Sequence, residues 1–246
     1  MENVIGKVNS VESFGSADGP GIRYVVFLQG CKMRCKYCHN PETWALEGGE
    51  EYTAKDLLAK AMRYKNYWGK NGGITVSGGE ALLQLDFVTE FFKLAKEKGV
   101  HTALDTSGNP FSMEPEYLEK FDELMKYTDL FIVDIKEMDE EKHLELTAKP
   151  NNNILDMIEY LSNHDKHMWI RHVLVPGLTD DEEGLIALRK FLDGLNQDMV
   201  DRVQVLPYHT LGMIKWDNLG IPYALEGVHV PSEEQINRAR EILKAI

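Results

Sequence analysis

The sequence predicts an α/β fold in which parallel strands alternate with helices. Three observations predict it. Six short, β-branched and nearly continuous apolar runs recur along the chain, amphipathic segments with helical spacing separate them, and no low-complexity or Pro/Ser-rich linker interrupts the alternation. Strands alternating with helices in this way are typical of a parallel sheet covered by helices. At 246 residues the chain is long enough to bury one large core.

The six apolar runs are the expected strands. They lie at 22–30, 73–79, 101–108, 129–136, 168–177 and 201–209. Each is apolar along almost its whole length rather than at every second residue. A continuous pattern of this kind is typical of parallel strands that are buried on both faces.

The amphipathic segments are the expected helices. They lie at 53–68, 82–99, 114–127, 152–164, 179–195 and 231–246. Gly99 suits the end of the second helix, and Pro115 falls in the first turn of the third. Thr179 and Ser232 are expected N-caps, because acidic residues follow both and favour the positive end of a helix.

The number of strand–helix units narrows the fold class. Parallel strands joined by helices cross over with the right hand, and eight such units close a TIM barrel. Six units predict a single-domain, partial (β/α)6 TIM-like barrel with parallel strands and an open mouth. Residues 1–246 are expected to form one domain, with an N-terminal segment 1–21 and six units over 22–246.

Composition excludes several classes of function. The formal net charge of −13 argues against nucleic-acid binding, which needs a basic surface. No apolar run approaches the ~20 residues of a membrane span. The first residues lack a basic region followed by an apolar core, so no secretory signal peptide is expected and the cytoplasm is the expected location.

Polar and reactive side chains gather where the expected strands end. In sheets of this class the functional site lies at the carboxyl ends of the strands. The candidates in chain order are Cys31, Cys35 and Cys38; Gly78, Gly79 and Glu80; Asp105 and Thr106; Asp134, Ile135 and Lys136; Arg171; and His209. Six strand ends that share this character predict one functional site rather than six ordinary loops.

All three cysteines of the chain fall in the segment GCKMRCKYCHN, 30–40. Its CKYCH stretch matches a c-type haem attachment pattern, but such attachment requires export. A closed zinc site needs four ligands, and His39 directly follows Cys38 rather than standing at the usual spacing. Three thiolates can hold a [4Fe–4S] cluster with one iron left open for a small molecule. We favour the cluster over zinc and over three reduced cysteines without a function.

The cysteine spacing C-x-x-x-C-x-x-C, with Tyr37 before the last cysteine, resembles the radical S-adenosylmethionine superfamily. Two further stretches, SADGPGIRYVVFLQGCKMRCKYCHNPETW and GGITVSGGEALLQ, resemble the activases of glycyl-radical enzymes. The resemblance covers essentially the whole chain. It is closest to the activases whose partner is pyruvate formate-lyase, through WIRHVLVPGLTDD and VQVLPYHTLGMIKW.

This resemblance implies the cofactors and the reaction. Cys31, Cys35 and Cys38 would bind a [4Fe–4S] cluster whose open iron chelates S-adenosylmethionine. Reductive cleavage would then give methionine and a 5′-deoxyadenosyl radical, which abstracts a hydrogen atom from a glycine of the partner. The electron would come from a low-potential donor such as flavodoxin or ferredoxin.

The resemblance also implies roles for other residues. Tyr37, with its neighbours Cys38 and His39, would lie near the adenine, and His209 near the ribose or adenine. Gly78, Gly79 and Glu80 would meet the methionyl amino group. Lys136, next to Asp134 and Ile135, suits the methionyl carboxylate. Arg171 is a cation on a buried strand, so it needs an anionic partner.

Two further sites are expected. Asp105, Thr106 and Asp134 offer hard oxygen ligands, and the resemblance implies a monovalent cation beside the methionyl carboxylate. Asp18 and Arg23 lie in the DGPGIR stretch, which by resemblance helps hold the glycine-bearing loop of the partner.

Three alternative functions remain. The first is a radical S-adenosylmethionine enzyme that acts on a small molecule, and the second is an activase of another glycyl-radical enzyme. The third is a non-catalytic iron–sulfur electron carrier, against which the missing fourth cysteine argues.

Overall fold

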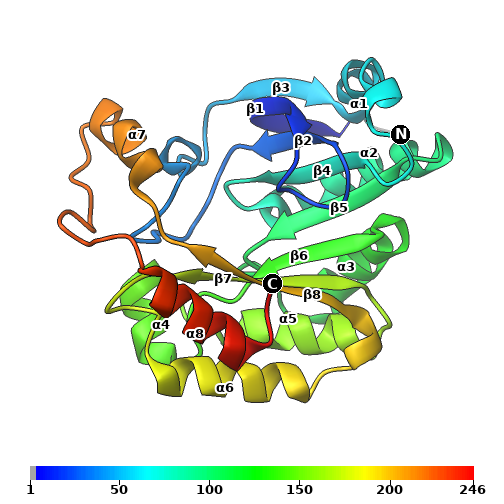
Figure 1. Cartoon of the computed structure of the whole chain (residues 1–246). Helices are drawn as coiled ribbons and strands as arrows, with labels where there is room; N and C mark the ends of the chain where they lie inside the picture. Colours follow the sequence, from blue (N-terminus) through cyan, green and yellow to red (C-terminus); the bar gives the residue numbers. More distant parts are fainter. Residues whose placement is uncertain (1–3) are drawn as a thin grey trace. The chain divides into compact units, whose positions relative to one another are not determined.

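The computed structural model describes residues 4–246. The strands follow the order β3-β1-β2-β4-β5-β6-β7-β8 and carry these labels in Figure 1. The chain forms two compact units. The first holds the residues up to Cys31 together with Thr43–Ile132, and the second holds Lys32–Glu42 and Val133–Ile246. Each unit is described by itself.

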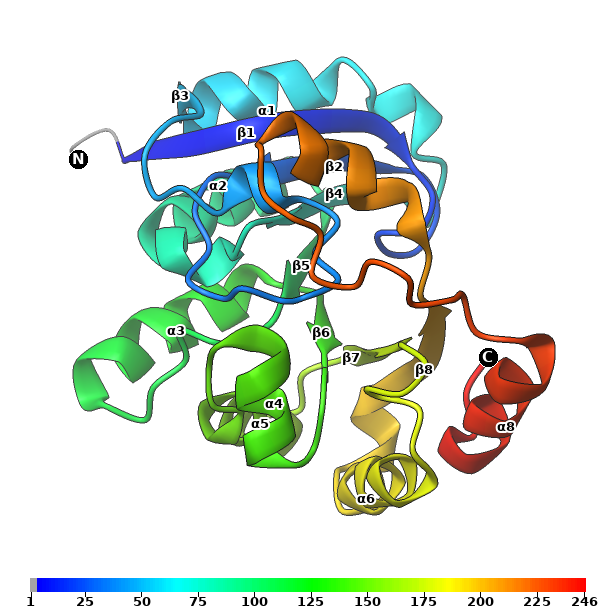
Figure 2. The ribbon, with the colours of Figure 1, turned by 90° about the vertical axis from the view of Figure 1, so that its left-hand side faces the viewer.

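The first unit contains five complete strands. They are β1 Ile5–Gly15, β2 Arg23–Leu28, β3 Glu50–Thr53, β4 Gly73–Gly78 and β5 His101–Thr106. β2 pairs with β4, and β4 with β5, in parallel, as the continuous apolar runs predict. β1 pairs antiparallel with both β2 and β3, and it lies alongside β2 in Figure 2.

Helices cover the sheet of the first unit. They are α1 Ala54–Met62, α2 Leu85–Glu97 and α3 Pro115–Tyr127, with 3-10 turns at Lys65–Tyr67 and Ala81–Gln84. Thr53 caps α1 through the backbone N–H of Asp56. The core is aromatic, because Phe91 and Phe92 of α2 and Phe121 of α3 are fully buried.

The second unit contains the last strands and helices. They are α4 Glu140–Thr147, α5 Asn152–Asn163, β7 Met168–Leu174, α6 Glu182–Asp193, β8 Val200–Pro207, α7 Met213–Asn218 and α8 Glu233–Leu243. The 3-10 turns Gln197–Met199 and Thr210–Gly212 precede β8 and α7, and the turn Pro41–Thr43 and strand β6 Leu130–Asp134 span the unit boundary. β7 and β8 pair in parallel, and α8 packs against α6 (Figures 1 and 2).

The structure confirms the α/β class and all six expected strands, each within a few residues, and corrects several details. β1 and β3 were not expected, and they make the sheet mostly rather than wholly parallel. α4 and α7 were also not expected.

One expected cap is wrong. Asp181 caps α6, with its carboxylate accepting from the Gly184 N–H. Thr179 instead turns its hydroxyl to the Val173 carbonyl and the Val175 N–H. Ser232 caps α8 as expected, in a capping box with Gln235.

Within residues 4–246, no helix is both long and apolar enough to cross a lipid bilayer.

Candidate active site

Cys31 lies in the first unit, three residues beyond the end of β2. Gly30 precedes it with φ +102°, a conformation that favours glycine, and donates its N–H to the Thr43 carbonyl at 2.8 Å. The Cys31 N–H donates to the Trp44 carbonyl at 3.4 Å. The side chain of Cys31 is buried and forms no disulfide. The chain therefore presents this cysteine from a turn that backbone hydrogen bonds hold in place.

Gly78 is the last residue of β4 and Gly79 follows it, and both lie against the backbone at the end of β2. A Cβ atom on Gly78 would lie 2.1 Å from the Leu28 nitrogen, and one on Gly79 would lie 2.2 Å from the Gly30 oxygen. The Gly79 N–H donates to the Leu28 carbonyl at 2.9 Å. Glycine is needed at both positions because a larger side chain would collide with the protein's own backbone. This reason is separate from the contact with the methionyl amino group that the resemblance implies.

Glu80 is buried and its carboxylate joins the end of β4 to the end of β5. It accepts hydrogen bonds from the hydroxyls of Thr106 and Ser107, from the Ser107 N–H at 2.9 Å and from the Leu82 N–H at 3.0 Å. A carboxylate with this many donors inside the unit orders the two strand ends.

Asp105 and Thr106 are consecutive in β5, so their side chains leave opposite faces of the sheet. Asp105 accepts a hydrogen bond from the Ser77 hydroxyl at 2.8 Å, whereas the Thr106 hydroxyl is used by Glu80. The Thr106 hydroxyl thus points to Glu80 and not toward Asp105, and the cation site expected at these residues stays a prediction. Within residues 4–246 no group of three or more His, Cys, Asp or Glu side chains is preformed as a metal site.

Cys35 and Cys38 lie in the second unit, where α4 holds the segment that carries them. The Arg34 and Lys36 N–H groups donate to the Thr147 and Leu146 carbonyls at 2.7 and 3.0 Å. Burial raises the pKa of the Cys35 thiol to about 11. A buried thiolate needs a positive partner, and an iron ion supplies one, so this cysteine fits a cluster ligand.

Tyr37 is buried in an apolar cluster with Leu146, Val175, Tyr208 and Leu225. Its hydroxyl has no hydrogen-bond partner among the residues that the structure describes. Burial raises the pKa of Tyr37, so the group stays a neutral phenol. A buried donor without a partner is uncommon and marks a place where a bound group can complete the hydrogen bonding.

Lys136 and Asp134 form an ion pair at the end of β6. The Lys136 ammonium lies 3.2 Å from the Asp134 carboxylate and 5.7 Å from the Tyr37 ring centroid, and its side chain is 9% exposed. Burial is the largest single influence and acts to lower the pKa of Lys136. Asp134, Tyr37 and Cys35 together outweigh it, and the pKa is raised well above its usual value. A fixed positive charge is therefore present beside Tyr37, as an anion-binding site requires.

Ile135 and Arg171 connect β6 to β7. The Ile135 N–H donates to the Arg171 carbonyl at 2.9 Å, and both residues are buried. His172, the next residue of β7, contacts the Ile135 carbonyl through Nδ1 at 2.9 Å. The N–H and the carbonyl of Ile135, the residue before Lys136, are thus both bonded to β7.

The segment from His209 to Trp216 packs against the cysteine segment within the second unit. The rings of His39 and His209 meet edge to face with centroids 4.2 Å apart. Lys215 donates to Asn40 at 2.7 Å and to Glu42 at 2.5 Å, and the Trp216 indole N–H donates to the Cys38 carbonyl at 2.8 Å. Sequence reasoning found the two histidines but assigned no role to Lys215 and Trp216.

Asp18 and Arg23 occupy different environments in the first unit. Asp18 is partly exposed, but Arg23 is fully buried and donates hydrogen bonds only within the unit. Burial lowers the pKa of Arg23 to about 10, so it stays charged at neutral pH. Arg23 therefore holds residues of its own unit in this structure, and the expected contact of Arg23 with a partner stays a prediction.

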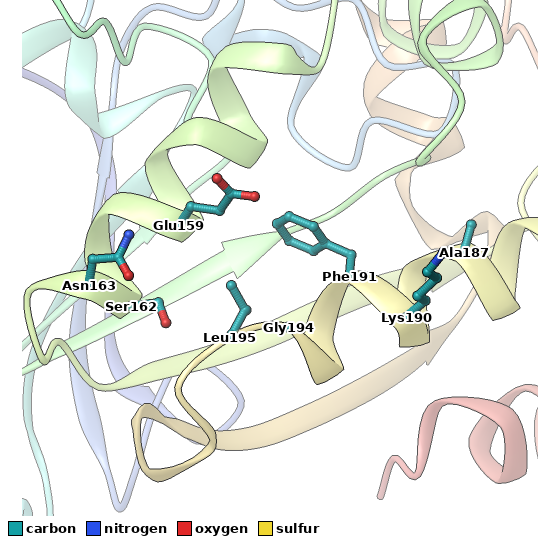
Figure 3. Close-up of a pocket in the computed structure, with 8 residues that line it drawn as sticks. All are labelled: Glu159, Ser162, Asn163, Ala187, Lys190, Phe191, Gly194 and Leu195. Carbon is teal, nitrogen blue, oxygen red and sulfur yellow. The ribbon is translucent and has the colours of Figure 1, made fainter.

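A depression of about 560 Å³ lies between α5 and α6 (Figure 3). Glu159, Ser162 and Asn163 line it from α5, and Lys190 and Phe191 from α6. It contains none of the residues that the sequence marks for chemistry.

Comparisons with known proteins identify the family of this chain. The model of the radical SAM superfamily matches residues 25–188. The pyruvate formate-lyase-activating enzyme of Streptococcus mutans is 54% identical over 98% of this chain and 92% of its own length. That of Listeria monocytogenes is 50% identical over 99% of this chain and 98% of its own length.

Solved structures show the same fold. A domain of pyruvate-formate lyase-activating enzyme from Bacteroides vulgatus is 29% identical, with a TM-score of 0.57 over 71% of this chain and 94% of its own. Streptococcus suis SuiB is 17% identical, with a TM-score of 0.66 over 95% of this chain and 46% of its own. The chain belongs to the radical SAM superfamily and, within it, to the family of pyruvate formate-lyase-activating enzymes.

Proposed function

We propose that the protein activates pyruvate formate-lyase by generating a glycyl radical on it, with a [4Fe–4S] cluster and S-adenosylmethionine as its cofactors. The observation that carries the proposal is similarity along nearly the whole chain to activating enzymes of this one kind. The three cysteines, which form no disulfide and stand at the spacing C-x-x-x-C-x-x-C, support it. Residues 1–246 act together as one radical SAM core.

Cys31, Cys35 and Cys38 hold the cluster in this proposal. When bound, it supplies the single electron that cleaves S-adenosylmethionine to methionine and a 5′-deoxyadenosyl radical, which takes a hydrogen atom from the partner's glycine. The chain's contribution is to keep the three thiols buried and their segments anchored. We also propose that the electron comes from a low-potential donor of the flavodoxin or ferredoxin type, and that the protein acts in the cytoplasm.

Lys136 binds the methionyl carboxylate, and Asp134 keeps its ammonium charged and in place. Tyr37 offers its unpartnered hydroxyl next to this charge, and the backbone of Ile135 keeps Lys136 in register. His39 and His209 contact the nucleoside from the two segments that they bring together. Arg171 adds a second buried cation from β7.

Gly78 and Gly79 contact the methionyl amino group through backbone atoms, and Glu80 acts by ordering their turn. Asp105 and Asp134 are the carboxylate ligands of the proposed monovalent cation. Thr106 contributes its backbone oxygen, because Glu80 uses its hydroxyl.

The test is anaerobic reconstitution with iron and sulfide, followed by incubation with a chemical reductant, S-adenosylmethionine and pyruvate formate-lyase. Electron paramagnetic resonance should show the doublet of a glycyl radical, and 5′-deoxyadenosine should form in parallel. Cys35→Ala should lose both signals, because a cluster ligand is missing. Full activity of Cys35→Ala would contradict the ligand assignment.

The alternative functions give different results in the same experiment. An enzyme for a small molecule would cleave S-adenosylmethionine but leave no glycyl radical on pyruvate formate-lyase. An activase of another enzyme would behave in the same way until its own partner is supplied. An electron carrier would form no 5′-deoxyadenosine at all.

A further inference from the structure

Helix α4 ends against the segment that carries Cys35. The last residues of a helix have carbonyl oxygens that no later turn of the helix uses. At the end of α4 the Thr147 carbonyl accepts from the Arg34 N–H at 2.7 Å. The Leu146 carbonyl accepts from the Lys36 N–H at 3.0 Å. The two residues that flank Cys35 thus both donate their amide protons to the end of one helix.

His143 and Thr147, both buried, close the end of α4 from inside the second unit. The Lys149 carbonyl can only accept, so His143 Nδ1, which lies 2.7 Å from it, must carry the ring proton. The Thr147 hydroxyl donates to the His143 carbonyl at 2.8 Å and accepts from the Lys149 N–H at 3.2 Å. The imidazole and the hydroxyl together fix the turn that follows α4, and with it the direction of the last two carbonyls.

The turn after α4 has a backbone conformation that these hydrogen bonds must hold. Ala148 has φ +61°, in the left-handed region that favours glycine. Its N–H donates to the Leu144 carbonyl at 2.8 Å. The contacts of the turn, rather than the preference of its own residues, therefore keep it in place.

The hydrogen bonds of these two amides affect how readily a cluster at Cys35 accepts an electron. An N–H that donates to a cluster sulfur stabilises the reduced form, which carries one more negative charge, and so raises the reduction potential. Here both N–H groups donate to carbonyls instead. The C-terminal end of a helix also carries a partial negative charge, and no basic residue lies in the last turn of α4. Both effects act to lower the potential.

We propose that His143 and Thr147 are positioning residues that keep the reduction potential of the cluster low, because they hold the α4 carbonyls on the amides beside Cys35. This inference deepens the proposed function and rests on it. In the reaction one electron leaves the reduced cluster, which returns to its oxidised form, and enters the sulfonium, whose carbon–sulfur bond breaks. A low potential favours this transfer.

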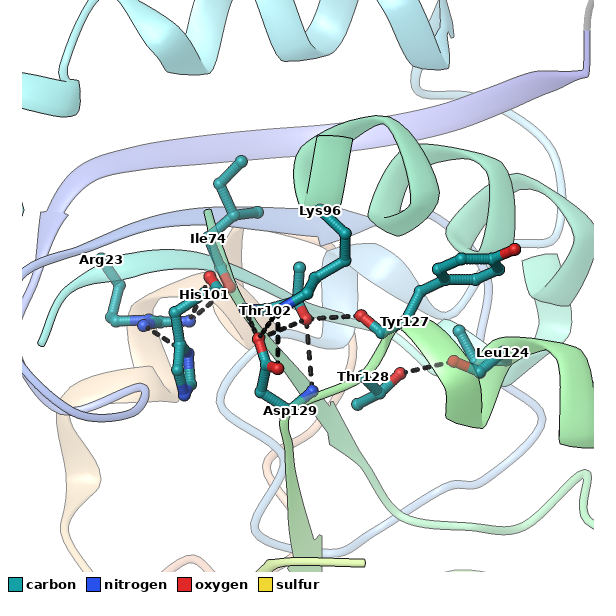
Figure 4. A network of polar contacts seen from close by, with 9 residues as sticks. All are labelled: Arg23, Ile74, Lys96, His101, Thr102, Leu124, Tyr127, Thr128 and Asp129. Carbon is teal, nitrogen blue, oxygen red and sulfur yellow. Dashed lines mark hydrogen bonds and ion pairs between the residues drawn. The ribbon is translucent and has the colours of Figure 1, made fainter. Parts of the chain in front are cut away.

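The test compares Thr147→Val with Thr128→Val, which are a matched pair. Both threonines are buried at the C-terminal end of a helix, and valine removes the hydroxyl with almost no change in shape. Each hydroxyl donates to the carbonyl four residues earlier, at 2.8 Å for Thr147 and at 3.0 Å for Thr128 (Figure 4). Thr128 follows α3, however, and residues 32–42 belong to the unit that contains α4.

The first measurement is the midpoint potential of the reconstituted cluster, titrated anaerobically and followed by electron paramagnetic resonance. Thr147→Val should raise it by about 59 mV, which is a tenfold change in a one-electron equilibrium and about what one hydrogen bond contributes. The equilibrium in Thr128→Val should stay within about twofold of wild type. Thr147→Ser keeps the hydroxyl and should restore the wild-type potential.

The second measurement needs no cluster. In the cluster-free protein the buried Cys35 should react with iodoacetamide only when its segment leaves α4. Thr147→Val should therefore speed the alkylation of Cys35 by about fivefold, measured by mass spectrometry of its peptide, and Thr128→Val should not. The melting temperature should fall similarly in the two valine variants, so a general loss of stability would not explain the difference.

A potential of Thr147→Val that equals that of wild type would overturn the inference, and so would an equal rise in Thr128→Val. Failure of the proposed function would look different, because the wild-type protein itself would then bind no cluster or produce no glycyl radical on pyruvate formate-lyase. A wild-type protein that works, with an unaffected Thr147→Val variant, refutes the positioning role alone.

Discussion

The indole N–H of Trp216 donates a hydrogen bond of 2.8 Å to the carbonyl oxygen of Cys38, 178 residues earlier in the chain. Trp216 is buried, and its ring packs edge to face against Tyr223 with centroids 5.1 Å apart. Next to it, Lys215 binds Asn40 and Glu42. The helix α7 therefore fastens the segment that follows the last cysteine.

Trp216→Phe should loosen that segment without removing a cluster ligand. The loss of one buried hydrogen bond costs about 1 kcal/mol. We expect near-normal iron content after reconstitution but a severalfold faster loss of the cluster in air. The decay of the cluster's visible absorbance measures this loss. The control is Trp68→Phe, because the Trp68 indole N–H is buried and has no hydrogen-bond partner among residues 4–246. Equal rates for the two variants would mean that ring volume alone matters.

Tyr37→Phe should separate stability from cofactor binding. The hydroxyl has no partner within the described chain, so its removal should leave the melting temperature of the cluster-free protein unchanged or higher. S-adenosylmethionine should bind about two- to tenfold more weakly to the reconstituted protein, measured by calorimetry under anaerobic conditions.

Tyr208→Phe is the matched control, in the same apolar cluster. Its hydroxyl accepts from Tyr223 at 3.0 Å, so this variant should lose stability and keep its affinity for the cofactor. An unchanged affinity of Tyr37→Phe for S-adenosylmethionine would show that the Tyr37 hydroxyl does not contact this cofactor.

Lys136→Met should weaken S-adenosylmethionine binding by about tenfold to 150-fold, as expected for a charge-assisted hydrogen bond. It should also lower stability, because the Asp134 carboxylate loses its partner. Adding Asp134→Asn should recover much of the stability but none of the affinity. Recovery of both properties in the double variant would show that Lys136 serves only to neutralise Asp134.

Asp129→Asn should lower stability in a pH-dependent way. Burial acts to raise the pKa of Asp129, but hydrogen bonds from Lys96 and the Thr102 N–H outweigh it and the pKa is lowered (Figure 4). A carboxyl group with a lowered pKa stabilises the fold above its unfolded pKa, and this stability is lost as pH falls through the folded value.

Because the Asp129–Lys96 pair is partly exposed, the effect at pH 7 should be about 1 kcal/mol. Urea unfolding at a series of pH values measures it. The difference between variant and wild type should shrink below about pH 4, near the ordinary pKa of aspartate. A difference that is constant with pH would mean that the lost charge is not responsible.

The strands that sequence reasoning found and missed differ in burial. β2, β4 and β5 are apolar because helices or other strands cover them, so their composition alone identifies them. β1 and β3 carry many exposed polar residues and resemble loops in composition. They form strands because β2 and β1 supply hydrogen-bond partners, which no local pattern records.

The same division applies to the site. The sequence by itself determined that three thiols, two glycines, an acid and a lysine follow successive strands. Because the carboxyl ends of parallel strands lie at one edge of a sheet, this order predicts a single site. Tertiary structure decided what each group can do. In the folded chain Thr106 donates to Glu80, Trp216 donates to the Cys38 carbonyl, and the buried Arg23 donates to the Pro20 carbonyl. These contacts join residues far apart in the chain, and hydrogen bonds between such residues depend on packing and direction, which residue type and spacing do not contain.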